Sequence, residues 1–511
     1  MAKKPLNLIL SEAQETGEHS LRRALGPWNL MSLGIGAIIG TGIFVLTGAA
    51  AAQYAGPAIV LSFVLAAVGC IFAGLCYAEF ASMIPVAGSA YTYGYATLGE
   101  FIAWIIGWDL ILEYAFGAAT VASGWSGYVL SFLQDFGIKI PPQLTGTPGT
   151  EFVLYADRWE HLTRIKPTLD AAGVDISSLP HVTGIFNLVA FIGIMIVTAI
   201  LIIGIKESAN FNTLIVIVKV AVLIIFIGLG TNYLLKNTDV ASTNWTPFIP
   251  PNEGSFGSYG LSGIVRAAGV IFFAYIGFDA VSTAAQEARQ PQKDMPIGIL
   301  GSLAICTVVY ILVAAVLTGL INFRQLNVPD PIAIGIDKTG VRWGSFLVKL
   351  GAIAGLSSTM VVMLLGQSRV FFSMSRDGLL PTWASKVHPR FRTPWISSLV
   401  VGFFVAFFAS IVPIAILGEL VSIGTLLAFV IVCGGIWALR RTNPDLHRPF
   451  KTPMVPLVPI LGIVISLLMM LGLPGDTWLR LIIWLVIGFV VYFTYGSKHS
   501  RVQTGQPPAR P

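Results

Sequence analysis

The chain has 511 residues, of which 55% are hydrophobic and only 11% are charged. Its repeated apolar runs lie outside the range of soluble globular proteins and are long enough to cross a bilayer. The formal net charge of +6 comes from basic residues gathered between these runs, so it requires no nucleic-acid partner. The composition excludes a soluble protein and predicts a polytopic membrane protein in contact with lipid.

The first 27 residues predict a cytoplasmic N-terminal tail, because they are rich in charge and have no sustained apolar core that would suit a signal peptide. Hydropathy then predicts an all-α integral membrane domain over 28–496, with about twelve transmembrane helices. A cytoplasmic tail is expected over 497–511. The expected spans are 28–52, 57–83, 98–133, 184–205, 208–235, 258–286, 296–321, 343–371, 394–412, 416–439, 454–474 and 478–496.

The charges between the spans predict their orientation. With both termini in the cytoplasm, the inner segments hold 19 Lys and Arg residues and the outer segments hold 9. This bias follows the positive-inside rule and favours a multi-pass protein of the plasma membrane with cytoplasmic termini. The polar stretch 137–183 then lies outside, where we expect a partly ordered extracellular loop with an amphipathic stretch from Tyr155 to Leu169.

Two spans have irregular centres in matching positions of the chain. GIGAIIGTGIF (34–44) interrupts the first span with glycines, and GVIFFAYIGFDAV (269–281) interrupts the span that begins near 258. Each is followed by four more spans. Because five is an odd number, two such units in tandem must have opposite orientations, which predicts a 5+5 inverted repeat over 28–235 and 258–439, followed by two extra helices over 454–496.

The interrupted centres predict a binding site. Unwound backbone is tolerated at membrane depth only where it lines a cavity or binds something. A helix that restarts after Thr41 presents free N–H groups that suit a carboxylate, and a helix that ends near 272–274 presents carbonyls that suit a cation. The alternative is that the glycines only allow close helix packing, which is common for small residues in membrane helices.

Three motifs carry a resemblance to a known family: GIGAIIGTGIFVLTG, CYAEFASMIPVAGSAYTYGYATLGE and FFAYIGFDAVSTAAQEARQPQKDMPIGI. They resemble the amino acid–polyamine–organocation superfamily, in its cationic amino acid transporter branch. The resemblance covers residues 20 to about 500 and implies a leucine-transporter-type fold and an α-amino acid as the cargo. Twelve spans, where animal members of the branch have fourteen, suit a bacterial-type member, while QEARQPQ departs from the more usual EE…NPQ pattern.

The resemblance also implies roles for particular residues. The carboxylate end of the cargo would be held by Ile38, Ile39, Gly40, Thr41 and Gly42. Carbonyl groups and a wall for the pocket would come from Phe273, Ala274 and Ile276, and Phe273 would also close the pocket.

Three further side chains within spans are candidates. Lys219 is costly in an apolar span, so we expect it to replace a cation beside the first interruption and to couple transport to protons, with snorkelling to the interface as the alternative. Glu113, one turn after Asp109, either faces the site or has a structural role as a hydrogen-bonding group. Met363 narrows the pocket, which favours small neutral amino acids such as alanine and leaves cationic amino acids as a further possibility.

Other functional classes find less support. All six histidines lie outside the spans, the four cysteines show neither metal-ligand spacing nor a disulfide framework, and no G-x-x-x-x-G-K-[ST] motif occurs. We therefore expect that the chain is not an enzyme and that it binds no metal and no cofactor. The expected partners are an amino acid, a proton, membrane lipid and, as an open option, a small accessory membrane subunit. An amino acid sensor or a channel-like protein on the same fold remains the alternative.

Overall fold

The computed structural model describes residues 25–84, 89–155, 158–203, 209–283, 285, 288–391 and 393–504. The expected N-terminal tail thus lies outside the described residues, apart from residues 25–27. Within the described part, seven helical stretches are long and apolar enough to cross a membrane: Gly42–Met83, Glu100–Asp135, Leu214–Lys236, Pro291–Leu320, Arg342–Arg376, Ile414–Thr442 and Gly475–Thr504. Shorter apolar helices are Leu188–Ile203, Gly260–Tyr275, Trp395–Ile411 and Leu457–Gly472. This confirms a mostly helical, multi-pass membrane protein.

The first half of the bundle contains α-helices and short π or 3-10 turns, and both kinds of turn are labelled η. They are α2 (Pro27–Ile38), η1 (Gly42–Leu46), α3 (Thr47–Ala50), η2 (Ala51–Ala55), η3 (Gly56–Ala58), α4 (Ile59–Met83), α5 (Ser89–Thr97), α6 (Glu100–Ile111), η4 (Leu112–Phe116), α7 (Gly117–Asp135), α9 (Leu188–Ile203) and α10 (Ala209–Lys236).

The second half continues with the same kinds of element. They are α11 (Thr238–Asn244), α12 (Gly260–Ile271), η7 (Phe272–Tyr275), α13 (Ala280–Thr283), α14 (Pro291–Leu320), η9 (Phe323–Gln325), α15 (Pro331–Lys338), α16 (Arg342–Arg376), η10 (Thr382–Ser385), α17 (Trp395–Ile411), α18 (Ile414–Thr442), α19 (Leu457–Gly472), α20 (Gly475–Val491), η11 (Tyr492–Gly496), α21 (Ser497–His499) and α22 (Arg501–Thr504).

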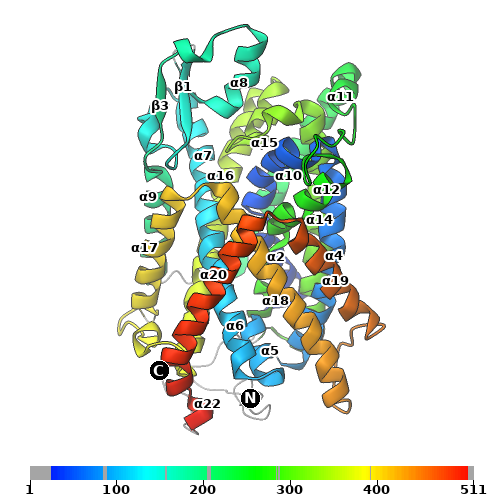
Figure 1. The fold of residues 1–511 in the computed structure, drawn as a ribbon, viewed down its shortest axis with the longest axis vertical. Coiled ribbons are helices and arrows are strands. Elements are labelled where there is room, and N and C mark those ends of the chain that lie inside the picture. Colours follow the sequence, from blue (N-terminus) through cyan, green and yellow to red (C-terminus); the bar gives the residue numbers. More distant parts are fainter. Residues whose placement is uncertain are drawn as a thin grey trace.

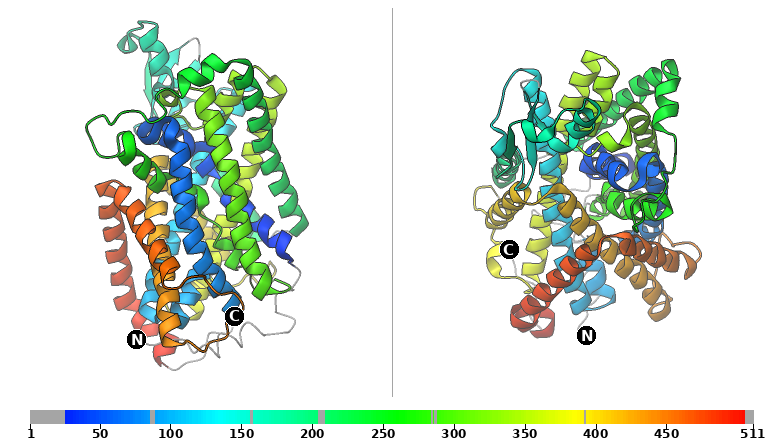
Figure 2. Two further views of the ribbon diagram at one scale, coloured as in Figure 1. Left: turned by 90° about the vertical axis from the view of Figure 1, so that its right-hand side faces the viewer. Right: turned by 45° about the horizontal axis from the view of Figure 1, so that its top comes forward.

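The interrupted helices lie inside the bundle, and α19 and α20 lie at its edge (Figures 1 and 2). Helix α2 packs against α10, α14 and α16, and α12 packs against α4, α18 and α19. Gly56, with φ +60°, and Pro57 end the first interrupted helix and turn the chain into α4, because glycine adopts this conformation without steric cost. The two interruptions are thereby surrounded by other helices.

The insertion after α7 corrects the all-α expectation. It carries an antiparallel sheet of order β2-β1-β3, made by β1 (Glu151–Tyr155), β2 (Arg158–His161) and β3 (His181–Thr183). The expected amphipathic stretch divides into β2 and helix α8 (Leu162–Ala171). Outside the apolar bundle, paired strands satisfy the main-chain hydrogen bonds that a helix would otherwise satisfy alone. Two 3-10 turns, η5 (Pro142–Leu144) and η6 (Ile176–Ser178), complete the insertion.

The chain after the last long helix is described up to residue 504. Ser500 is buried, and the Glu100 carboxylate at the start of α6 accepts hydrogen bonds from Tyr95 (2.8 Å), Tyr492 (3.0 Å) and Gln503 (2.7 Å). The described part of the expected C-terminal tail is therefore packed against the bundle.

Candidate functional site

The first interrupted helix opens between residues 38 and 42. Helix α2 ends at Ile38, and Ile39 is extended, with φ −72° and ψ 98°. The chain becomes helical again at Thr41 and continues as the π turn η1. The first N–H groups of a restarted helix have no partner within that helix, so this point offers free donors.

The second interrupted helix opens between residues 272 and 280. Helix α12 ends at Ile271, η7 follows, and Ile276 is extended, with ψ 139°. Gly277 has φ +109°, a conformation that favours glycine, and the chain becomes helical again at Ala280. The carbonyls at the end of such a helix point away from it and can meet a cation.

The two openings lie against each other. A Cβ added to Gly42 would come within 2.2 Å of the Ala274 Cα, and one added to Gly277 would come within 2.9 Å of the Ala37 carbonyl carbon. Each of the two segments therefore needs a glycine for their backbones to approach this closely. These glycines thus allow close helix packing, and the same close packing brings the two openings together.

Lys219 on α10 reaches the first opening. Its Nζ donates hydrogen bonds to the carbonyls of Gly36 (2.7 Å) and Ile39 (3.1 Å) and to Thr359 Oγ1 on α16 (2.9 Å). The side chain is 0% exposed, and its stem packs along Gly355. The lysine thus points into the bundle and does not snorkel to a surface.

Other side chains also hold the carbonyls of the first opening. Tyr310 on α14 donates to the Ile38 carbonyl (2.9 Å), and Thr359 lies 3.2 Å from the Ile39 carbonyl. In contrast, the buried Thr41 hydroxyl has no hydrogen-bond partner within the described ranges. The acceptor end of this opening is therefore occupied by protein donors, and its donor end holds the unused polar groups.

Acidic side chains lie beside the second opening. Glu113 in η4 accepts a hydrogen bond from Thr425 on α18 (3.2 Å), and Tyr114 donates to Asp279 (3.2 Å). The carboxyl groups of Glu113 and Asp279 are close enough to interact directly. Asp109, one turn before Glu113, is also buried, and neither of its carboxyl oxygens has a hydrogen-bond partner in the part of the chain that is described. Carboxyl groups therefore gather near the opening that presents carbonyls.

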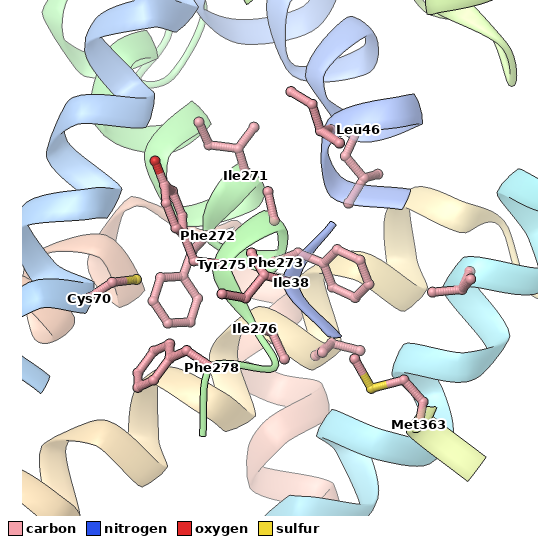
Figure 3. Close-up of a cluster of buried hydrophobic side chains, with 14 of the residues drawn as sticks. Ile38, Leu46, Cys70, Ile271, Phe272, Phe273, Tyr275, Ile276, Phe278 and Met363 are labelled. Carbon is pink, nitrogen blue, oxygen red and sulfur yellow. The ribbon is translucent and has the colours of Figure 1, made fainter. Parts of the chain in front are cut away.

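Apolar side chains complete the surroundings. Phe273 and Met363 belong to the buried cluster around the two openings, together with Ile38 and Ile276 (Figure 3). The Met363 sulfur lies 3.6 Å from the position of a Cβ on Gly117, one turn after Glu113. All of the predicted site residues are buried: Ile38, Ile39, Gly40, Thr41, Gly42, Glu113, Lys219, Phe273, Ala274, Ile276 and Met363.

Sequence reasoning missed three of the polar side chains at the openings. Tyr310 and Thr359 lie on helices far along the chain from the carbonyls they contact, and Tyr114 lies next to the predicted Glu113. A tyrosine or threonine in an apolar helix is common and gives no signal by itself. Their role depends on which helices pack together, which the local sequence does not specify.

The chain is similar to known proteins along most of its length. A family model described as amino acid permease matches residues 25–497. The chain is 45% identical over 491 residues to the branched-chain amino acid permease BcaP of Bacillus subtilis (strain 168), covering 96% of each chain. It is 42% identical over 498 residues to the methylthioribose transporter of the same organism, covering 98% of each. It is 36% identical over 429 residues to the vacuolar cationic amino acid transporter 4 of Arabidopsis thaliana, covering 84% of this chain and 65% of the relative.

These matches run along nearly the whole chain and include both interrupted helices. They confirm the resemblance that the three motifs indicate. The chain belongs to the amino acid permease family, as a bacterial-type member of the cationic amino acid transporter branch of the amino acid–polyamine–organocation superfamily.

Proposed function

We propose that the chain is a proton-coupled carrier that takes up neutral L-amino acids by alternating access, with an inverted repeat over 28–235 and 258–439. The observation that carries this proposal is the contact between the two interrupted helices, one at the start of a helix segment and the other at the end of one, where main-chain groups of opposite polarity are presented. A zwitterion needs both polarities at one place. Neither a simple pore nor a close-packed helix pair needs free N–H groups beside free carbonyls.

In this proposal the carboxylate of the amino acid binds at the restart of the first helix. The first N–H groups of the restarted helix, after Gly40, donate to it because they have no partner within that helix, and so does the buried Thr41 hydroxyl, which has no hydrogen-bond partner within the described residues. The ammonium group binds the carbonyls at the end of η7, near Phe273 and Ala274, and the carboxyl groups of Glu113 and Asp279 lie nearby as further acceptors. The side chain then lies against Met363 and Phe273.

Proton coupling is assigned to Lys219. A protonated lysine has three N–H donors, and the Nζ has three acceptors in Gly36, Ile39 and Thr359. Loss of the proton removes one donor, so one buried acceptor loses its partner and the end of α2 is held less firmly. Protonation of one side chain is thereby linked to the position of the first interrupted helix.

The cargo is proposed to be small and neutral, with alanine as the reference. Met363 takes up space and offers no charge to a cationic side chain. The names of the relatives extend the set of ligands that should be compared, because they include branched-chain amino acids, cationic amino acids and methylthioribose. The plasma membrane, cytoplasmic termini, bound lipid and an accessory membrane subunit stay predictions.

Transport by purified protein in liposomes tests this function. We expect alanine to accumulate when the outside is acidic, and we expect a protonophore to stop that accumulation. The Lys219→Met variant should lose accumulation, and the Lys236→Met variant, changed at an exposed lysine, should keep it. Undiminished accumulation in Lys219→Met would contradict the coupling role.

Counterflow in the same liposomes separates a carrier from the alternatives. A carrier exchanges labelled amino acid against an unlabelled internal pool, and a channel does not. Binding of alanine without any flux would identify a sensor. Competition by valine, arginine and methylthioribose ranks the cargo, and stronger competition by arginine than by alanine would contradict the assignment of a neutral cargo.

A further inference from the structure

A cavity of about 500 Å³ lies between the inserted sheet and the helical bundle. Its inner wall includes the apolar side chains of Val45, Ala49 and Leu130 from the first interrupted helix and α7, next to the small polar side chains of Ser123 and Ser126. Its outer wall comes from the insertion and includes Glu151, His161 and Lys166. The volume is within the range of small-molecule sites. The cavity therefore combines one apolar side with one side that carries both signs of charge.

The insertion is fixed in place as the roof of this cavity. Helix α8 packs against β1 and β2 and also against η9, which connects α14 to α15. Figure 1 shows the insertion above α7, with α8 on its side toward α15. At its base, the Asn187 amide donates to Ser126 (2.8 Å), and the Asn187 backbone N–H donates to the Ser410 carbonyl (3.0 Å). The roof thus connects two separate parts of the bundle.

The cavity lies close to the first opening. Val45 and Ala49 follow Gly42 by three and seven residues, which is about 5 and 10 Å along a helix. Between them and the opening, Tyr128 of α7 donates to the Phe44 carbonyl (2.7 Å), and the two rings pack edge to face at 5.9 Å. This contact lies, along the first interrupted helix, between the cavity wall and the candidate site.

We propose that this cavity is an outer binding site, in which an amino acid with an apolar side chain is held by Glu151 and Lys166 before it passes to the interrupted helices. The inference rests on the proposed function. Glu151 binds the ammonium group, Lys166 binds the carboxylate, and the side chain lies on Val45, Ala49 and Leu130. Because Glu151 and Lys166 are exposed, the site is weak and loads the carrier without retaining its cargo.

Protection of a thiol in the cavity wall tests this site directly. The four native cysteines are buried, so a membrane-impermeant maleimide should react mainly with a cysteine introduced by Ser123→Cys. We expect valine to slow this labelling at least threefold. The matched control is Ala172→Cys, at an exposed position of the insertion outside the cavity, where valine should change nothing.

Two backgrounds locate the protection. Glu151→Gln combined with Lys166→Gln should abolish it, whereas Asp170→Asn combined with Lys236→Gln, which also removes one charge of each sign, should preserve it. Gly42→Ala, which obstructs the interrupted helices, should preserve it as well. Protection that disappears in Gly42→Ala but survives loss of Glu151 and Lys166 would assign the effect to the central site and overturn the inference.

Transport by these variants covers the case in which Gly42→Ala does not fold. Removal of the two charges should lower kcat/KM for valine by about tenfold and leave kcat unchanged, because only loading is impaired. Unchanged kcat/KM, or a Ser123→Cys protein that transports valine while valine leaves the labelling of its thiol unchanged, would contradict the outer site and leave the proposed function standing. Native protein that neither binds nor transports any amino acid would remove both.

Discussion

The two interrupted helices satisfy their main-chain groups in different ways. At the first opening, side chains from three other helices, Lys219, Tyr310 and Thr359, take up the carbonyls that α2 leaves free. At the second opening, the chain bonds to itself, from the Ile276 N–H to the Phe273 carbonyl (3.2 Å) and from the Ser282 N–H to the Asp279 carbonyl (2.8 Å).

The difference gives the candidate site its polarity. With its carbonyls occupied, the first opening has mainly N–H groups to offer, which suits an anion. The second opening has acids beside it and carbonyls at the end of η7, which suits a cation. Two openings built alike would offer the same polarity twice and would not distinguish the ends of an amino acid.

The largest expected effect comes from the point where the openings touch. Gly42→Ala places a Cβ 2.2 Å from the Ala274 Cα, so backbone must move, and we expect transport to be lost and the free energy of unfolding to fall by about 1–3 kcal/mol. Thermal unfolding and alanine uptake measure the two effects. Gly434→Ala in α18 is the control, since a Cβ added there meets no other atom within 4 Å. Equal effects of the two substitutions would show that the contact with Ala274 is unimportant.

Next comes removal of a hydroxyl from each opening. Tyr310→Phe leaves the buried Ile38 carbonyl without this donor, which should lower the free energy of unfolding by about 1–3 kcal/mol. Ser422→Ala removes a longer bond, 3.3 Å, to the Val270 carbonyl inside α12, and should cost less than about 1 kcal/mol. Denaturation in detergent measures both. A larger loss in the free energy of unfolding for Ser422→Ala than for Tyr310→Phe would contradict the expected difference between the two openings.

Pocket size provides a third test. Met363→Ala removes bulk near Gly117 and Phe273, so the preference for leucine over alanine should rise by about tenfold, within the range expected for one or two methylene groups. Competition in uptake assays gives the ratio. An unchanged ratio would place the side chain of the cargo elsewhere in the bundle.

The smallest effect is expected at the acidic cluster. Glu113→Gln can still accept from Thr425 but is a weaker acceptor for an ammonium group, so alanine affinity should fall by about fivefold, within the range expected for one typical hydrogen bond. Ligand-induced thermal shifts measure this affinity. A compound with a carboxylate and no ammonium group should be unaffected, and an equal loss for that compound would separate Glu113 from the cation pole.

The sequence predicts the openings better than their partners. The glycines at 40, 42 and 277 are local signals, so the interruptions after Ile38 and Ile271 could be predicted from the sequence. A lysine within an apolar span is equally conspicuous, so the burial of Lys219 could be predicted too. Tyr310 and Thr359 were not, because their contacts span 272 and 320 residues of chain. The inserted sheet was missed for a related reason: β1 pairs with β3 across an intervening strand and helix, and short strands carry little periodicity.

Calorimetric binding of an amino acid and two of its derivatives tests the central claim most directly. Alanine has both poles, alaninamide lacks the carboxylate, and propionate lacks the ammonium group. If main-chain dipoles of opposite sign at the two openings hold the cargo, alanine binds and each derivative loses at least about tenfold in affinity, since each leaves buried polar groups unpaired. Binding of alaninamide or propionate as tightly as alanine would contradict the account.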